Sequence, residues 1–302
     1  MLTDAIRTYL ALRRAAGFQL RVAGALLEHF AAFATAAGDT HVRAATALSW
    51  AAAAPSVGQR SRRLQVVRRF ARDAVLDDRR HEVPPQGAFG RRPPRRTPYI
   101  FSGEEIGRLL AAASDLSPRG SLRPRTYATL FGLIASTGLR VSEALRLRLG
   151  DVTADGLVIR ETKFRKSRMV PLHPTARDAL TSYLAERTRF ETPDDAVFLS
   201  LRGRELAYPT VNAMFAALTR GLGLRARHGR GPRIHDLRHT FAVRSLERCA
   251  MERAAVAQHV LALSTYLGHA HLADTYWYLQ ATPGLLGDIA DAAEAHLTRG
   301  AP

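Results

Sequence analysis

The chain has 302 residues, of which 46% are hydrophobic, so it is long and apolar enough to bury one large core or two of ordinary domain size. Its 44 Lys and Arg outnumber its 27 Asp and Glu, and the formal net charge of +17 predicts a polyanionic partner, with nucleic acid first. The sequence lacks a membrane-spanning apolar run and a signal-peptide pattern, and its single cysteine, Cys249, excludes an internal disulfide framework. We therefore expect a soluble protein without a membrane partner, in the cytoplasm and associated with the nucleoid.

Residues 1–78 have the apolar spacing of helices, which we predict over Thr3 to Gly17, Val22 to Gly38 and Gln59 to Leu76. In the third helix the apolar residues can face a core while a set of arginines projects elsewhere. These arginines are Arg62, Arg63, Arg69 and Arg72. They indicate either a DNA-binding face or an ordinary solvated surface, and we predict a helical DNA-binding domain over residues 1–78.

The composition changes in "RRHEVPPQGAFGRRPPRR", residues 79–96, which contains four prolines, two glycines and six arginines. Such a stretch is typical of an extended linker, and we place the linker at residues 79–98. Its later arginines either follow a phosphate backbone or belong to a plain solvated tether. They are Arg91, Arg92, Arg95 and Arg96.

Residues 99–302 mix helical and strand patterns. Ser102 and Glu105 have capping-box spacing before an apolar run, and two short strand-like runs around a polar turn, 157–160 and 168–172, predict a hairpin. Helical patterns cover Thr126 to Ser136, Pro174 to Arg187, Pro209 to Arg220, His235 to Glu247 and Ala254 to Tyr266. The expected fold class is mainly α with a small β-sheet, that is, α+β.

Four segments of this second domain carry groups that suit a phosphodiester. They are "STGLRVSEAL" with Arg140, "ETKFRKSRMVPL" with Lys163 and Lys166, "HDLRHTF" with His235 and Arg238, and "YLGHAHLADTYWYL" with His269, Tyr276 and Tyr278. Each segment taken alone is typical of surface charge or of a core aromatic residue. Together and in this order, the four segments are a more specific signal than any one of them alone.

The ordered set resembles the tyrosine recombinase family, also called the phage integrase family, over nearly the whole chain. The resemblance implies a helical core-binding domain followed by a catalytic domain. It also implies an Arg, Lys, His, Arg, His and Tyr set, which falls on Arg140, Lys163, His235, Arg238, His269 and Tyr278. The sequence around the last histidine and tyrosine is more similar to that of recombinases carried by transposons and plasmids than to that of recombinases that resolve chromosome dimers.

The chemistry explains why these residue types are needed. Tyrosine is a weak nucleophile, so its attack on a phosphodiester requires removal of the phenolic proton and neutralisation of the phosphoryl oxygens, for which Arg140 and Arg238 provide permanently charged forks. By resemblance, Tyr278 becomes joined to the 3′-phosphate, Lys163 protonates the leaving 5′-hydroxyl, and His269 hydrogen-bonds the phosphate. His235 assists proton transfer by the same resemblance. We expect no metal and no cofactor, since the sequence shows neither a Walker-type loop nor an acidic triad in a metal-binding context.

Three assignments have alternatives. His235 and His239 have the i, i+4 spacing of a zinc pair, but Arg238 lies between them and the usual adjacent glutamate is missing, so we interpret His239 as a structural neighbour that packs or caps. Lys166 competes with Lys163 in the same turn, and Tyr276 competes with Tyr278. The two tyrosines are about 200° apart on an ideal helix, so they cannot face one phosphate, and the nine-residue step from His269 in the family pattern favours Tyr278.

The expected function is site-specific recombination of double-stranded DNA by a homotetramer on paired sites, for integration, excision or resolution of a mobile element. Partner recombinases or accessory proteins can be required. The alternatives are strand relaxation of the type IB topoisomerase kind and a DNA-binding regulatory role. The tail after Tyr278 is expected to pack on a neighbouring subunit or on its own domain through Leu285, Leu286, Ile289 and Ala293.

Overall fold

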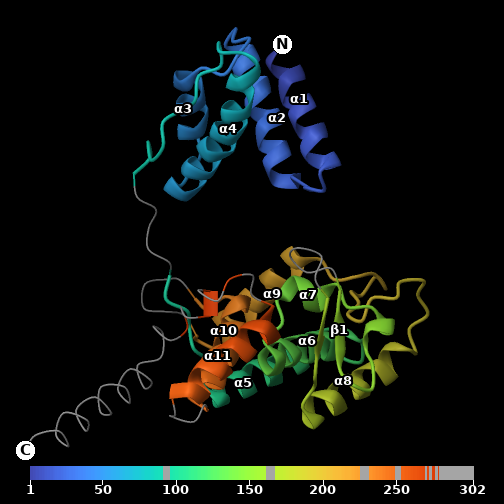
Figure 1. Ribbon diagram of the computed structural model, residues 1–302. Helices are drawn as coiled ribbons and strands as arrows, with labels where there is room; N and C mark the ends of the chain where they lie inside the picture. The colour runs from blue at the N-terminus through green and yellow to red at the C-terminus, as the bar shows by residue number, and fades with distance from the viewer. Residues whose placement is uncertain are drawn as a thin grey trace, which may run out of the picture. The chain divides into compact units, whose positions relative to one another are not determined.

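The structure is a computed structural model that describes residues 1–90, 96–160, 167–224, 231–248, 253–268, 271, 274–275 and 278. The chain divides into two compact units, Met1–Arg96 and Thr97–Pro302 (Figure 1). Within the described ranges, none of the helices combines the length and the apolar character that crossing a bilayer requires.

The first unit packs helices around one apolar core (Figure 1). They are α1 (Leu2–Ala15), α2 (Arg21–Ala36), α3 (Ala44–Ala52) and α4 (Val57–Asp77). The predicted helices are confirmed to within three residues, but the sequence patterns missed α3. Its first backbone N–H, from Ala44, donates to Glu82 Oε2 at 2.8 Å, so a residue 38 positions away caps this helix, and Trp50 anchors it in the core. A cap from a distant residue leaves no signal in the sequence next to the helix, which explains why α3 was missed.

Residues 79–90 lie on the first unit instead of forming an extended tether. The backbone N–H of Glu82 donates to Val42 O at 2.8 Å, and Val83 and Phe89 pack against the helical core. This corrects the expected start of the linker, because the division between the units follows Arg96. Arg96 is half-buried, whereas Arg91, Arg92 and Arg95 lie outside the described residues.

The second unit is helical with a small sheet, so the expected mainly α fold with a two-stranded hairpin is confirmed. Strand β1 (Leu157–Ile159) pairs antiparallel with β2 (Arg168–Val170), with Leu157 opposite Val170. The other elements are α5 (Gly103–Ser114), α6 (Arg123–Thr137), α7 (Val141–Leu145), η1 (Leu149–Asp151), α8 (Pro174–Arg187), α9 (Tyr208–Gly221), α10 (Ile234–Glu247) and α11 (Arg253–Leu267). Helix α6 contacts α5, α8 and α10, which makes it central to the unit (Figure 1).

The capping box predicted at the start of α5 is present. Ser102 Oγ accepts the backbone N–H of Glu105 at 3.0 Å, and Glu105 Oε2 accepts the backbone N–H of Ser102 at 2.8 Å. The next residue before the box, Phe101, donates its backbone N–H to Thr240 Oγ1 on α10 at 3.0 Å. The segment that enters the second unit is therefore fixed to the helix that carries the histidines of the predicted site.

Gly138→Ala is expected to destabilise the second unit by about 2–5 kcal/mol, because two costs add at this position. Gly138 ends α6 with a φ of +63°, and an alanine Cβ would lie 2.5 Å from Phe241 Cδ1 and 2.9 Å from Leu267 Cδ2. The left-handed backbone costs a residue with a Cβ about 1–2 kcal/mol, and overpacking adds about 1–3 kcal/mol. Urea unfolding of the full chain measures the loss.

The matched control is Gly132→Ala, in the interior of the same helix. Its Cβ would meet only Leu110 side-chain atoms, at 3.7 and 3.8 Å, and its backbone needs no special conformation. Alanine there should be neutral or stabilise by about 0.5–1 kcal/mol. Equal losses for the two variants would contradict the explanation for Gly138.

Candidate active site

The first turns of α10 carry His235, Arg238 and His239, so one helix face presents all three side chains. Asp236 fixes the start of this helix: its carboxylate accepts the backbone N–H of Arg233 at 2.8 Å and the Arg233 guanidinium at 2.8 Å. Because Asp236 is fully buried, this cap holds the first turn in one position.

Three consecutive backbone carbonyls at the end of α11 each accept a hydrogen bond from a different arginine. The last carbonyls of a helix have no partner within it and carry its partial negative charge, so cations are favourable there. The pairs are Arg168 Nε with Tyr266 O at 2.8 Å, Arg238 Nη2 with Leu267 O at 2.8 Å, and Arg140 Nη2 with Gly268 O at 2.9 Å. The end of α11 thus collects guanidinium groups from β2, from α10 and from the residue before α7.

Arg238 is fixed by two carbonyls and is 1% exposed. Besides Leu267 O, it donates through Nη1 to Gly138 O at 2.6 Å. Burial and the nearby charge of Arg140 lower the pKa of Arg238 to about 10, so the group stays charged at neutral pH. The result is a preorganised cation beside a second one, an arrangement that suits an anionic oxygen.

Glu143 lies between Arg140 and Arg168 and is buried. Its Oε1 accepts Arg140 Nη1 at 2.7 Å, and Arg168 binds both carboxylate oxygens, at 3.1 and 2.9 Å. Burial alone would raise the pKa of Glu143, but the hydrogen bonds and charges of Arg168 and Arg140 outweigh it and lower the pKa to about 2. Glu143 is therefore a permanent anion that joins the hairpin strand β2 to Arg140.

The sequence patterns did not identify Glu143 or Arg168. The i, i+3 spacing of Arg140 and Glu143 was a usable signal, since the Glu143 carboxylate also accepts the Arg140 backbone N–H at 2.9 Å. Arg168 is 25 residues further along the chain, and only the fold brings it to Glu143.

Tyr278, the predicted nucleophile, is 2% exposed and packs against apolar side chains of α10 and α11. Its hydroxyl lies 3.1 Å from His239 Nδ1, within hydrogen-bond distance. The His239 ring also packs edge-on against His235, with ring centroids 4.5 Å apart. We expected His239 to be a structural neighbour that packs or caps. It does pack against His235 and Tyr278, and its Nδ1 also contacts the Tyr278 hydroxyl.

His235 is a neutral imidazole at physiological pH. Burial is the main cause, with the positive charge of Arg238 next, and together they lower the pKa of His235 to about 4. A neutral ring beside two arginines can take part in proton transfer without adding a positive charge in the resting state.

Several predicted site residues lie outside the described residues: Lys163, Lys166, His269 and Tyr276, and with them the tail residues Leu285, Leu286, Ile289 and Ala293. The two lysines belong to the segment that joins β1 to β2. The base of this hairpin is described, and there Arg168 on β2 contacts Glu143.

The predicted basic face of α4 is exposed at Arg62, Arg69 and Arg72. Arg63 differs, because its guanidinium stacks on the Trp50 ring at 5.1 Å and donates to Trp50 O at 3.2 Å. Arg63 is half-buried and packs α4 against α3.

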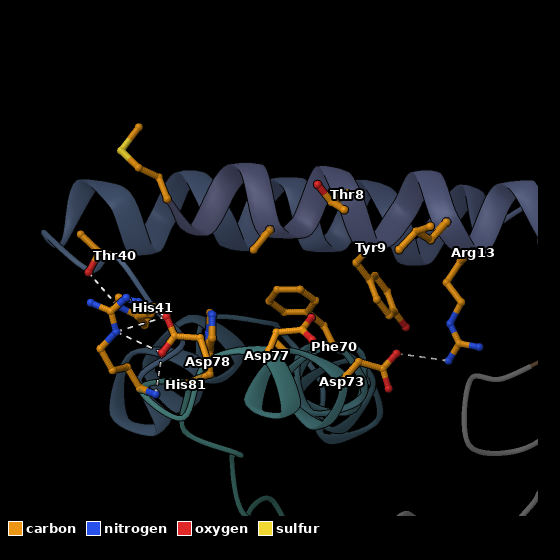
Figure 2. Close-up of a pocket in the computed structure, with 15 residues that line it drawn as sticks. Thr8, Tyr9, Arg13, Thr40, His41, Phe70, Asp73, Asp77, Asp78 and His81 are labelled. Atoms are coloured by element: carbon orange, nitrogen blue, oxygen red, sulfur yellow. Dashed lines mark hydrogen bonds and ion pairs between the residues drawn. The ribbon is translucent and has the colours of Figure 1, made fainter.

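A second group of polar residues lines a cavity of about 590 Å³ in the first unit, where His41, Asp78 and His81 place possible metal ligands within 4.8 Å of one another (Figure 2). Their atoms already have partners. His41 Nε2 is 3.1 Å from Asp78, Arg80 binds both oxygens of that carboxylate, and His81 Nδ1 accepts the backbone N–H of Val42 at 3.0 Å. A histidine that binds a metal normally donates a hydrogen bond from its other ring nitrogen, whereas His81 Nδ1 accepts one. We therefore interpret the group as a structural link between the loop before α3 and the end of α4.

Comparison with known proteins gives the family. Residues 100–284 match the Phage integrase family. A Sinorhizobium fredii protein described provisionally as the integrase/recombinase y4rB is 42% identical over 295 residues, 94% of each chain. The tyrosine recombinase XerC of Actinobacillus pleuropneumoniae is 31% identical over 239 residues, 78% of this chain and 72% of the relative. The chain therefore belongs to the phage integrase family, and its enzyme class is tyrosine site-specific recombinase.

Solved structures share the fold. The Tn1549 transposon integrase in complex with transposon right end DNA has a TM-score of 0.69 at 15% identity, over 98% of this chain and 99% of that one. XerH recombinase bound to a palindromic difH substrate has a TM-score of 0.62 at 19% identity, over 83% of this chain and 71% of that one. At these identities the likeness concerns the fold alone.

Proposed function

We propose that this recombinase cleaves and rejoins duplex DNA through a covalent 3′-phosphotyrosyl intermediate on Tyr278. The observation that carries the proposal is the grouping of the Tyr278 hydroxyl with Arg238 and Arg140. Arg238 and His239 are neighbours on α10, and His239 contacts the Tyr278 hydroxyl. Burial lowers the pKa of Arg238, and two neighbours are near enough to affect it as well: Arg140 lowers it further and Tyr278 raises it. A nucleophile beside two fixed cations is a combination that suits phosphoryl transfer.

The proposed cleavage step transfers the phosphoryl group from the 5′-oxygen of the DNA to the Tyr278 oxygen. The Tyr278 oxygen forms a bond to phosphorus, the bond from phosphorus to the 5′-oxygen breaks, and the phenolic proton passes to a neutral histidine, His235 by the family's assignment. The leaving 5′-oxygen takes a proton from Lys163. Arg140 and Arg238 neutralise the non-bridging oxygens throughout. Religation is the reverse with a different 5′-hydroxyl, and it needs no external energy because the phosphotyrosyl bond replaces a phosphodiester.

The remaining roles rest on the resemblance and on charge. Lys163 and His269 complete the set, and the exposed arginines of α4 bind DNA phosphates, as do Arg91, Arg92, Arg95 and Arg96. Four copies of the chain act on two DNA sites, with partner recombinases or accessory proteins where the element requires them. Integration, excision or resolution of a mobile element is the proposed role. Support comes from relatives named as integrases and from a neighbour that is a transposon integrase.

Covalent trapping tests this proposal. The full chain is incubated without added metal with nicked duplexes that tile the DNA flanking its own gene. A nick just beyond the cleavage site lets the short fragment with the freed 5′-hydroxyl diffuse away, which prevents religation. The wild type should give a denaturant-resistant protein–DNA band with one duplex, and Tyr278→Phe should give none. Binding of a duplex without any band would favour the regulatory role. Relaxation of a supercoiled plasmid that carries the trapped sequence, without exchange between two such sites, would favour the topoisomerase-like activity.

A further inference from the structure

We propose that His239 is a further catalytic residue, which holds the Tyr278 hydroxyl through a hydrogen bond at Nδ1. This inference rests on the proposed function, since it assigns a role toward the proposed nucleophile. It goes beyond the six residues that the family resemblance implies, because His239 is not one of them.

The contact between His239 and Tyr278 joins two defined polar atoms. His239 Nδ1 lies 3.1 Å from the Tyr278 hydroxyl oxygen, and the ring centroids are 5.4 Å apart. His239 is 3% exposed and Tyr278 is 2% exposed, so the hydroxyl lies where water is scarce and a polar partner matters. The edge-on contact with His235 limits rotation of the His239 ring, which keeps Nδ1 on the hydroxyl.

The position of His239 on α10 connects its contact with Tyr278 to the proposed phosphate ligand. Arg238, the proposed phosphate ligand, is fixed by Gly138 O and Leu267 O, and His239 is the next residue on the same rigid helix. One helical turn therefore sets both the phosphate ligand and the oxygen that attacks the phosphate. A displacement of about 1 Å in such an arrangement can cost about 100-fold in rate.

The rival interpretation is that His239 only fills space beside Tyr278. The two interpretations differ in whether the atom at the Nδ1 position matters or only the ring. Phenylalanine keeps a ring and removes the polar atom. Asparagine places its amide group at the Nδ1 position, whereas glutamine extends one carbon further, toward the position of Nε2.

The experiment compares His239→Phe, His239→Asn and His239→Gln in the full chain. It measures the single-turnover rate of covalent trapping on the duplex that traps the wild type, together with the affinity for that duplex and the melting temperature. We expect His239→Phe to trap at least about 30-fold more slowly with unchanged DNA affinity. His239→Asn should recover to within about 5-fold of the wild type, and His239→Gln should not. Equal rates for Asn and Gln, or a wild-type rate for Phe, would overturn the proposal.

His259→Phe is the matched control. His259 Nε2 lies 2.9 Å from Ser245 O, so this histidine also links α10 to α11, but it does so through Ser245. Its loss should lower the melting temperature without slowing trapping by the folded protein. A loss of rate equal to that of His239→Phe would show that a general loosening of the two helices explains both results, against the proposal.

A measurement without DNA separates this inference from the proposed function. In protein labelled with ¹³C at the tyrosine Cζ, the Tyr278 resonance is assigned by its disappearance in Tyr278→Phe. It should shift in His239→Phe and keep nearly its wild-type position in His239→Asn. An unchanged resonance in His239→Phe would show that the hydrogen bond is absent and would overturn the inference. If instead the shift occurs and the wild type traps no duplex, the proposed function fails while the contact stands.

Discussion

Arg238→Lys is expected to slow DNA cleavage by at least about 100-fold while leaving the chain folded. Arg238 donates to Gly138 O and to Leu267 O from two different nitrogens, and this pair of contacts fixes the guanidinium plane. Lysine has one nitrogen and cannot make both contacts and also present a fork to a phosphate. Losing one fixed donor at a developing negative charge costs about 100- to 1000-fold in other enzymes.

The measurement is single-turnover covalent trapping, with DNA affinity and urea unfolding determined in parallel. Leaving one buried carbonyl without its donor should lower the free energy of unfolding by about 1–3 kcal/mol. Arg244→Lys is the control on the same helix, because Arg244 donates to Phe101 O at 2.7 Å and has no part in the proposed site. A cleavage rate for Arg238→Lys within about 5-fold of the wild type would argue against Arg238 as the phosphate ligand.

Glu143→Gln should lower the free energy of unfolding at pH 7 by about 3 kcal/mol, since it leaves two arginines around a neutral partner. The pKa of Glu143 is lowered to about 2 in the folded chain. A folded pKa below the unfolded value means that the carboxylate stabilises the fold above about pH 4.5 and that this stabilisation is lost as the pH falls toward 2. The shift corresponds to about 3 kcal/mol.

Urea unfolding at several pH values tests this prediction. The difference in stability between wild type and Glu143→Gln should be constant at neutral pH and should shrink as the pH falls below about 4.5. Glu186→Gln is the control: Glu186 pairs with Arg125 at 2.9 Å, but both side chains are about a third or more exposed, so its loss should cost less than about 1 kcal/mol. A difference for Glu143→Gln that does not change with pH would show that the carboxylate charge is not the cause.

Local patterns in the sequence were sufficient for most helices and for the hairpin. The capping box of Ser102 and Glu105 depends on residues three apart, and the hairpin depends on two apolar runs around a polar turn, so both are visible in a short window. Arg140, Arg238 and Tyr278 were predicted from the resemblance to the family, and the fold places the three residues near one another.

The features that were missed depend on contacts between distant parts of the chain. Glu82 caps α3 from 38 residues away, and Arg168 reaches Glu143 across 25 residues. Arg63 stacks on Trp50, a contact that helical spacing alone does not reveal. His239 had a readable position four residues after His235, but its role became visible only when the fold brought Tyr278 to its ring.

The most direct test of the central claim is to identify the residue that carries the DNA. The covalent complex of the wild-type chain is trapped on a nicked duplex, digested with protease and nuclease, and analysed by mass spectrometry for the peptide that bears the residual nucleotide. We expect a nucleotide joined through a 3′-phosphate to Tyr278. A nucleotide on Tyr276, or a 5′-phosphate linkage at any residue, would contradict it.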